Sequence, residues 1–403
     1  MLDAYEALCP SDPYHHWDDL ERLTAPAGVS HEVWWAALKL ARSPRMCVLP
    51  LCDRTGRPFR YCVPDSLQSQ AHRLDRDRAA SVVDADTFRQ LAARALDHEA
   101  MASARLAGAD LPADQARELL RTGRPSRDHD ERKVGNLGRA LQEAGGWRDR
   151  DLRPEMVLDL HRMIMDGLPA QPDSVGRLRR DDETPAVGGA GRSEPPPAGE
   201  LDRRLESMCA FANDKVPGAF IHPLIRAAIL HFWLAYDRPF VDGNGRAARA
   251  LFHWIMLRQG YDGFALLPVS AVLAQAPDRY ALAFRQTEAD DNDLTYFILH
   301  QAGAVRAADR ELQLEMQRSA KQREQAARNV RTFAELNPRQ QALVAHALRR
   351  PEVEYVIAGH QHSHGVTHQT ARDDLFDLVR RGLLSVSREG RTYRFHSTGM
   401  RPH

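Results

Sequence analysis

The sequence predicts a mainly α-helical protein, in which a helical bundle carries a β-hairpin flap and is flanked by a small α/β N-terminal region and a C-terminal winged helix. Helical periodicity dominates from residue 87 to residue 296. One long stretch rich in proline and glycine interrupts it and supplies the flap. Near the C-terminal end, two helical segments precede a pair of short strands, which is the order of elements in a winged helix.

Composition and charge exclude several classes of protein. Of the 403 residues, 43% are apolar and 27% are charged, as in ordinary globular proteins. Lys plus Arg and Asp plus Glu balance at 55 each, so bulk charge gives no reason to expect binding to nucleic acid or to an anionic membrane. The longest apolar run, residues 227–236, is half of the roughly twenty residues that a membrane-spanning helix needs. No membrane partner is expected, and the absence of a basic and apolar leader predicts a cytoplasmic protein.

Residues 1–85 form the predicted N-terminal α/β region. Apolar segments at residues 48–52 and 59–63 flank a polar turn that contains Gly56, which predicts strand, turn and strand. Residues 64–78 have the pattern of a helix. The five cysteines of the chain contain no Cys-x-x-Cys pair, so neither a disulfide framework nor a zinc site is indicated.

The predicted helical core, residues 86–296, contains the flap at residues 170–199. Within it, residues 183–189 can form a short hairpin, and three consecutive prolines at 195–197 form a stiff exit. By composition alone, a lid over a binding site and a flexible linker are equally good interpretations. We favour the lid, because the flap lies upstream of the segment that carries the chemistry of the chain, within the same helical core.

The remaining residues divide into a connector and a small C-terminal unit. Residues 297–335 are predicted as a connector, within one long polar helix from Leu294 to Arg331. Residues 336–403 are predicted as the winged helix. Its expected elements are helices at Pro338 to Arg349 and Thr367 to Arg381, Gly382 as a helix C-cap, and two strands around residues 388–391.

Two kinds of partner are considered for the C-terminal unit. One is duplex DNA, and the other is a protein, which can be a second copy of this chain. Its ten Arg against six acidic residues are a modest excess for a DNA-binding domain. Asp373, Asp374 and Asp377 on the second helix would oppose contact with phosphates, so contact with another protein or self-association is at least as good an expectation as duplex binding. Four neighbouring histidines suggest a metal site, but a solvated loop is the simpler interpretation. These histidines are His360, His362, His364 and His368.

The most informative segment runs from Tyr236 to Arg249, between two helical segments. Gly243 and Gly245 lie where a turn leads into a helix, so several backbone N–H groups point the same way and the helix dipole adds positive charge. Arg246 and Arg249 are three residues apart and share one helix face, where they can hold neighbouring phosphates. These features predict an anion-binding site.

Asp242 and Asn244 complete the predicted site. A carboxylate beside bound phosphates is suited to hold Mg²⁺, and the asparagine side chain adds an amide donor. The alternative is a tight turn between helices, in which Asp242 only caps the second helix.

Residues 238–249 (Arg-Pro-Phe-Val-Asp-Gly-Asn-Gly-Arg-Ala-Ala-Arg) resemble the signature of the Fic (Fido) domain family, His-x-Phe-x-(Asp/Glu)-Gly-Asn-Gly-Arg-x-x-Arg. Every position agrees except the first. Residues 220–226, residues 187–189 with the prolines that follow, and residues 293–296 are also similar to that family. Together with the two terminal regions, the resemblance covers nearly the whole chain, and it implies a Fic-type helical bundle.

The resemblance implies that the helical core binds ATP with Mg²⁺ and transfers AMP to a hydroxyl group of a target protein. The roles that it implies are metal binding by Asp242, phosphate binding by Gly243, Asn244 and Gly245, contact with the middle phosphate by Arg246 and with the terminal phosphate by Arg249, and a core anchor at Phe240. Arg238, Asn244 and Arg246 stand at the family's catalytic positions. The flap edge at Val187, Gly188 and Gly189 would receive the backbone of the target as an added strand.

The first departure from the family is Arg238, which stands where the family has a histidine that acts as general base. A guanidinium has a pKa above about 12 and offers no lone pair to an incoming hydroxyl proton. Loss of a positioned base costs about 10²–10⁴-fold, so AMP transfer is expected to be impaired, altered or absent. His231, His253 and Asp237 are not expected to substitute, because helical geometry or packing directs them elsewhere.

The second departure concerns self-inhibition. Residues 103–108 are similar to the Ser-x-x-x-Glu-Gly segment that blocks the site in many relatives, but Ala107 replaces its glutamate. By this route Arg249 is expected to be left unpaired. Glu99 lies two helical turns upstream and is not expected to replace the missing glutamate.

Two functions follow from these patterns. The first is an enzyme resembling protein adenylyltransferases, in which Arg238 impairs or alters transfer. The second is a catalytically silent, nucleotide-sensing or DNA-associated regulator that acts through the winged helix.

Overall fold

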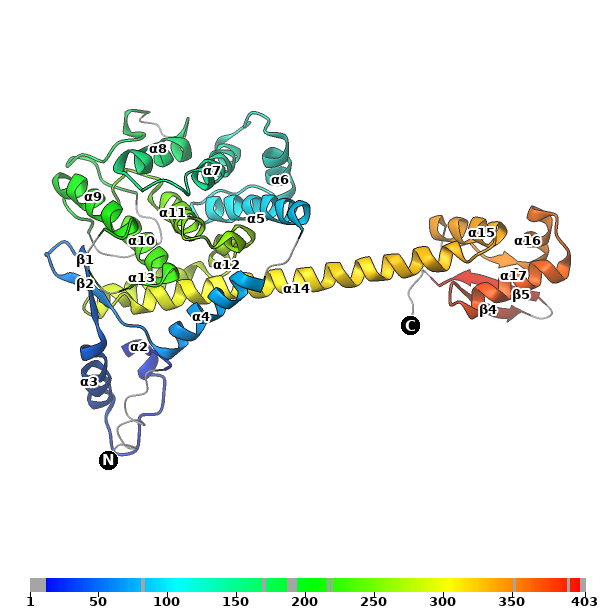
Figure 1. Ribbon diagram of the computed structural model, residues 1–403, viewed down its shortest axis with the longest axis horizontal. Coiled ribbons are helices and arrows are strands. Elements are labelled where there is room, and N and C mark those ends of the chain that lie inside the picture. The colour runs from blue at the N-terminus through cyan, green and yellow to red at the C-terminus, as the bar shows by residue number, and fades with distance from the viewer. Residues whose placement is uncertain are drawn as a thin grey trace. The chain divides into compact units, whose positions relative to one another are not determined.

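The structure is a computed structural model that describes residues 12–80, 84–168, 172–186, 194–215, 218, 220–350, 353–389 and 392–398. The chain divides into two compact units, Met1–Gln313 and Leu314–His403. The elements of the first unit are α2 (Trp17–Leu20), α3 (His31–Arg42), β1 (Cys47–Cys52), β2 (Pro58–Tyr61), α4 (Asp65–Ala80), α5 (Ala85–Leu106), α6 (Ala113–Thr122), α7 (His129–Gly146), α8 (Pro154–Met165), α9 (Leu201–Ala212), α10 (Pro223–Asp237), α11 (Asn244–Arg258), α12 (Val269–Gln275) and α13 (Pro277–Ala289) (Figure 1). Helix α14 (Thr295–Ala334) begins in this unit and corresponds to the long helix predicted from the sequence.

The mainly helical fold class is confirmed, and α10 forms its centre. Every residue of α10 from Leu224 to Asp237 is buried. A mostly apolar helix that is buried on all sides must be covered by other elements, and α10 packs against both α9 and α11. Helix α11 also packs against α5, α7 and α8, as Figure 1 shows for α5 and α7. The α10–α11 connection therefore lies within the rigid core of the first unit.

The predicted strand, turn and strand of the N-terminal region are confirmed by β1 and β2. The two strands pair antiparallel, with Cys47 opposite Tyr61 and Cys52 opposite Pro58. Phe59 of β2 is fully buried, and its ring packs against those of Phe232 and Tyr236 on α10 at 5.2 and 5.0 Å. The hairpin is thus attached to the helix that leads into the predicted anion site.

The predicted hairpin of the flap is not seen in the described part of residues 170–199, which contains two short 3₁₀ turns and no strand. Val187, Gly188 and Gly189 lie outside the described residues. The described segment instead bonds to the turn after α10, because the Arg179 N–H donates to the Pro239 carbonyl at 2.8 Å and the Ala186 N–H donates to the Val241 carbonyl at 2.7 Å. These N–H groups are therefore not free to pair with a second strand.

The second unit has its own small core. Its elements are α15 (Pro338–Arg349), β3 (Tyr355–Val356), α16 (Ile357–His364), α17 (His368–Arg380), β4 (Leu384–Glu389) and β5 (Thr392–Ser397). The strands form one antiparallel sheet in the order β3–β5–β4. Leu375, Leu378 and Phe395 are completely buried in the core of this unit. The two predicted helices and the strand pair are observed, while the winged-helix assignment stays a prediction.

The sequence interpretation was wrong for residues 357–364, which form helix α16 rather than a loop. Ile357 packs into the core of the second unit, and the buried His360 ring lies 3.2 Å from Asp374 on α17. These tertiary contacts stabilise a short polar helix that has little amphipathic pattern of its own. Among the described residues, no group of three or more histidine, cysteine or acidic side chains could hold a metal ion. No helix described by the structure is long and apolar enough to cross a bilayer.

Candidate functional site

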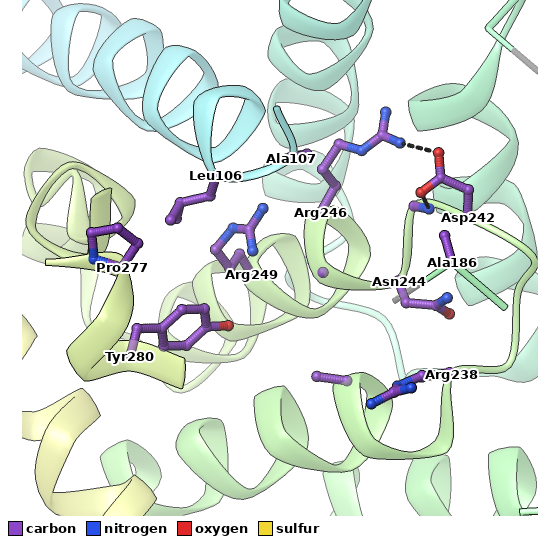
Figure 2. A pocket seen from close by; sticks show the side chains of 13 residues that line it. Leu106, Ala107, Ala186, Arg238, Asp242, Asn244, Arg246, Arg249, Pro277 and Tyr280 are labelled. Carbon is purple, nitrogen blue, oxygen red and sulfur yellow. Dashed lines mark hydrogen bonds and ion pairs between the residues drawn. The ribbon is translucent and has the colours of Figure 1, made fainter. Parts of the chain in front are cut away.

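A pocket of 410 Å³ lies at the connection between α10 and α11 (Figure 2). It brings together seven of the residues predicted from the sequence, namely Arg238, Asp242, Gly243, Asn244, Gly245, Arg246 and Arg249. The rest of its lining comes from Leu106, Ala107, Ala186, Ala235, Pro277 and Tyr280. The pocket therefore joins the signature to the end of α5, the flap and the start of α13.

Residues 238–243, which we call the signature turn, reverse the chain between α10 and α11. Arg238 ends α10 in the left-handed region, with φ of +43°, and Gly243 begins α11 with φ of +81°. A Cβ atom on Gly243 would lie 2.8 Å from Sδ of Met165, so glycine is needed there for both conformation and space. This close approach brings the start of α11 against α8.

Asn244 holds the signature turn closed. Its Oδ1 accepts the Phe240 N–H at 3.0 Å, and its Nδ2 donates to the Phe240 carbonyl at 2.8 Å. The sequence predicted a donor for a ligand, whereas the structure shows both ends of the amide bonded to backbone. Phe240 itself is completely buried, which confirms the prediction of a core anchor.

Asp242 does not cap α11, so the capping role that the alternative interpretation gave it is wrong, while the choice between an anion site and a tight turn stays open. Gly243 is the N-cap residue, and no side chain caps it. The Asp242 carboxylate accepts the Gly243 N–H through Oδ1 at 2.6 Å and pairs through Oδ2 with Arg246 Nη2 at 3.1 Å. Because 56% of the Asp242 side chain is exposed, the carboxylate is also accessible from the pocket.

Arg246 is a buried cation with unused donors. Its side chain is 2% exposed, and its Nε and Nη1 atoms have no hydrogen-bond partner. Burial lowers the pKa of Arg246, while the charge of Asp242 opposes that shift. A buried donor without a partner costs about 1–3 kcal/mol, so the site favours a ligand that supplies acceptors. Figure 2 shows Arg246 and Asp242 paired above the other pocket residues.

Arg249 has no carboxylate partner at residue 107, as expected, but Ser103 of α5 holds it by another route. Its Nε donates to Ser103 Oγ at 2.7 Å, and its Nη2 donates to the Ser103 carbonyl at 2.8 Å. Ser103 faces α11 and accepts both hydrogen bonds from Arg249, whereas Ala107 has no carboxylate that could accept them. Glu99 is buried and bonds to the Ser270 N–H at 2.8 Å and to the Ser270 hydroxyl.

Arg238 is the nearly buried cation at the end of α10, with 8% of its surface exposed. Its carbonyl accepts the Nε–H of Arg179 at 2.8 Å, and its side chain lines the pocket. Burial lowers the pKa of Arg238, and the charge of Glu288 opposes that shift. The guanidinium stays protonated at neutral pH, because its ordinary pKa lies so far above 7.

The residues considered as substitute bases are directed elsewhere. His231 is completely buried, with Nε2 2.7 Å from the Tyr280 hydroxyl, and the buried His253 does not line the pocket. The Asp237 carboxylate accepts hydrogen bonds from Arg204 at 2.6 Å and from Trp233 at 3.0 Å. Among the described residues that line the pocket, only Asp242 and Tyr280 have a side-chain group that can give up a proton and then act as a base.

The sequence did not indicate His161 of α8, which contacts the signature turn from outside the pocket. Its ring stacks on Phe240 at 3.7 Å, and its Nε2 lies 2.9 Å from the Asp242 carbonyl. Burial lowers the pKa of His161 to about 4, so the ring is neutral. In the sequence, His161 is one polar residue in an amphipathic helix, and no local pattern distinguishes it from an ordinary buried histidine.

Comparison with known proteins finds relatives for the region that contains this site. Residues 151–256 match the Fic/DOC family model. The protein adenylyltransferase Fic of Drosophila sechellia is 30% identical over 152 residues, which are 36% of this chain and 29% of the relative. The protein adenylyltransferase fic-1 of Caenorhabditis elegans is 34% identical over 113 residues, 28% of this chain and 20% of the relative. The matched region thus spans less than a third of these curated relatives.

Solved structures show a similar fold. A Fic family protein from Desulfovibrio desulfuricans G20 superposes with a TM-score of 0.52 and 20% identity, over 84% of this chain and 96% of that one. Fic-1 from C. elegans gives a TM-score of 0.52 and 20% identity, over 73% of this chain and 79% of the other.

Proposed function

Because residues 151–256 belong to the Fic/DOC family, we propose that this chain binds ATP with Mg²⁺ in the pocket at the signature turn and that Arg238 strongly impairs AMP transfer to target proteins. The relatives named above are protein adenylyltransferases, so AMP transfer is the activity expected of the fold. The observation that carries the proposal is that Arg238 lines the same pocket as Asp242, Arg246 and Arg249, at the position where the proposed transfer would need a proton acceptor.

The pocket residues fit a nucleotide phosphate chain. The two unpartnered donors of Arg246, the guanidinium of Arg249 and the N-terminal end of α11 supply positive charge. Asp242 would hold Mg²⁺, since one carboxylate together with phosphate oxygens is a common ligand set for this ion. When bound, Mg²⁺ would neutralise charge that develops on the phosphate chain. Arg246 pairs with Asp242 and would therefore contact the phosphates that lie beside the bound Mg²⁺.

The proposal predicts how a target hydroxyl behaves in this pocket. A hydroxyl that attacks the phosphate next to the ribose must lose its proton to an acceptor within hydrogen-bond reach. Arg238 can bind and orient an anionic oxygen, but it cannot take up that proton. Binding of nucleotide is therefore retained while the transfer step is slow.

The test compares the natural chain with Arg238→His and Arg238→Ala, using radiolabelled ATP, Mg²⁺ and a cell lysate as the source of targets. We expect Arg238→His to label proteins about 10²–10⁴-fold faster than the natural chain. Arg238→Ala is the matched control, since it removes the guanidinium without supplying a base. Equal rates for all three, or no binding of millimolar Mg-ATP to the natural chain, would contradict the proposal.

One observation favours a second candidate function, that of a catalytically silent regulator that binds duplex DNA through the C-terminal unit. Asp374 is 6% exposed and bonds to Arg339 and Asn337, and Asp377 pairs with Arg380 and Arg381. These carboxylates therefore oppose a DNA phosphate less than the sequence suggests. Gel-shift titrations at several salt concentrations test this function, and binding that does not weaken with salt would contradict phosphate contact.

A further inference from the structure

We infer that His161 is a positioning residue of the nucleotide site, whose imidazole ties the signature turn to the flap and fixes the peptide of Asp242 where phosphates and Mg²⁺ need it. This inference rests on the proposed function. His161 does not line the pocket, so its effect must pass through Asp242.

Both ring nitrogens of His161 have backbone partners. Gly176 donates its N–H to Nδ1 at 3.1 Å, and Nε2 lies 2.9 Å from the carbonyl oxygen of Asp242. Because Nδ1 accepts a hydrogen bond, the single proton of the neutral ring must sit on Nε2, where the carbonyl accepts it. The two contacts thus determine one tautomer, and that tautomer connects residue 176 of the flap to residue 242.

Packing prevents the imidazole from turning away from these partners. The ring is 2% exposed and lies parallel to the Phe240 ring, with 3.7 Å between centroids and 4° between planes. Phe240 is in turn held by the amide of Asn244. A Cβ atom on Gly243 would lie 3.3 Å from Cδ2 of His161, which shows how closely the signature turn follows the ring.

The position of the Asp242 peptide decides what the pocket presents. The same residue that receives the His161 hydrogen bond carries the exposed carboxylate, and the peptide that follows it carries the N–H of Gly243. A rotation of this peptide would move both groups, together with the partner of Arg246. Groups that orient a ligand-binding residue in this way typically change affinity by 10–100-fold when they are removed.

The experiment measures the affinity for Mg-ATP by calorimetry in His161→Phe and His161→Gln. Phenylalanine keeps a flat ring against Phe240 but has neither donor nor acceptor, so we expect affinity to fall by roughly 10–100-fold. Glutamine carries an amide oxygen that accepts and an N–H that donates, and we expect it to restore most of the loss. His253→Phe is the matched control, because it removes a buried histidine that does not line the pocket, and it should leave affinity unchanged.

The outcomes separate this inference from the proposed function. If the natural chain binds no Mg-ATP, the proposed function fails whatever the variants do. If the natural chain binds and His161→Phe binds equally well, or if His161→Gln loses as much affinity as His161→Phe, the positioning role is overturned. Nitrogen-15 NMR of the natural chain gives an independent measurement that needs no variant to fold. We expect the Nε2–H tautomer for His161, and an Nδ1–H tautomer would also overturn the inference.

Discussion

Ser103 on α5 and Arg249 on α11 form a two-point contact across the wall of the pocket, in which the guanidinium donates to the serine hydroxyl at 2.7 Å and to the serine carbonyl at 2.8 Å. Serine 103 begins the segment that resembles the inhibitory motif of relatives. The cation expected to meet the terminal phosphate is thus engaged although the motif has lost its glutamate. A phosphate that binds Arg249, as proposed, would have to share or replace these hydrogen bonds.

Ser103→Ala is expected to lower stability and to strengthen the response to nucleotide. Ser103 is completely buried, and its loss leaves the Nε–H of Arg249 without an acceptor, which costs about 1–3 kcal/mol of unfolding free energy in urea titrations. Bound phosphate would supply a new acceptor, so affinity for Mg-ATP measured by calorimetry should rise severalfold. Ser69→Ala, at an exposed serine of α4, is the control that should change neither quantity. Weaker binding by Ser103→Ala would show that the contact prepares Arg249 for its ligand instead.

Ala107→Glu is expected to rebuild the missing brake. Ala107 ends α5 and lines the same pocket as Arg249, so a glutamate there can place a carboxylate beside the guanidinium. That carboxylate would compete with the terminal phosphate, and we expect affinity for Mg-ATP to fall by roughly tenfold, or about 1.4 kcal/mol. Ala107→Gln has the same shape without the charge. If both variants bind equally weakly in calorimetry, the effect is steric and the electrostatic explanation fails.

Much of the fold could be predicted because strong local signals agree with the tertiary structure. The hairpin of β1 and β2 has a glycine turn between apolar segments, α10 is mostly apolar, and α14 is long and polar. Helix α16 could not be predicted, since its Gly- and His-rich sequence has no helical pattern and its stability comes from burial of Ile357 and His360. Part of the predicted flap hairpin, residues 187–189, lies outside the described residues, so that hairpin stays a prediction.

The candidate site was predictable to the extent that it is contiguous in sequence. Residues from Arg238 to Arg249 converge on one pocket because a single turn and one helical face carry them. The supporting contacts come from distant segments, and Ser103 and Arg249 are 146 residues apart. No local pattern predicts that Ser103 would accept from Arg249 or that His161 would stack on Phe240. These contacts depend on how α5 and α8 pack against α11.

Gly243→Ala is expected to disrupt the site more than the same change at a matched glycine. Gly243 and Gly56 have nearly equal φ angles of +81° and +85°, but a Cβ atom meets Met165 at 2.8 Å only at Gly243, while nothing lies within 4 Å at Gly56. The left-handed backbone alone costs about 1–2 kcal/mol, which Gly56→Ala measures in urea unfolding. We expect Gly243→Ala to cost about 1–3 kcal/mol more through overpacking, and to abolish detectable Mg-ATP binding. Equal losses at the two glycines would mean that α8 yields to the extra methyl group.

Stability is expected to fall as the pH drops from 7 towards 4, because several buried histidines are neutral in the folded chain. Burial lowers the pKa of His253 and of His300 to about 4, and it lowers the pKa of His231 well below its ordinary value. In the unfolded chain these side chains take up protons near pH 6.5, so the unfolded state binds more protons than the folded state throughout this interval. Added acid therefore stabilises the unfolded state relative to the folded state.

Each of these histidines should remove about 1–2 kcal/mol of unfolding free energy between pH 7 and pH 5, measured by urea titrations at several pH values. Above about pH 7.5, well above the pKa of about 6.5 in the unfolded chain, both states hold the neutral ring, and the histidine contribution to the pH dependence should vanish. His253→Phe keeps an apolar ring against Phe264 and removes one proton-binding group, so its stability should fall less steeply with acid than that of the natural chain. Parallel curves for the two proteins would show that His253 is already accessible to protons in the folded state.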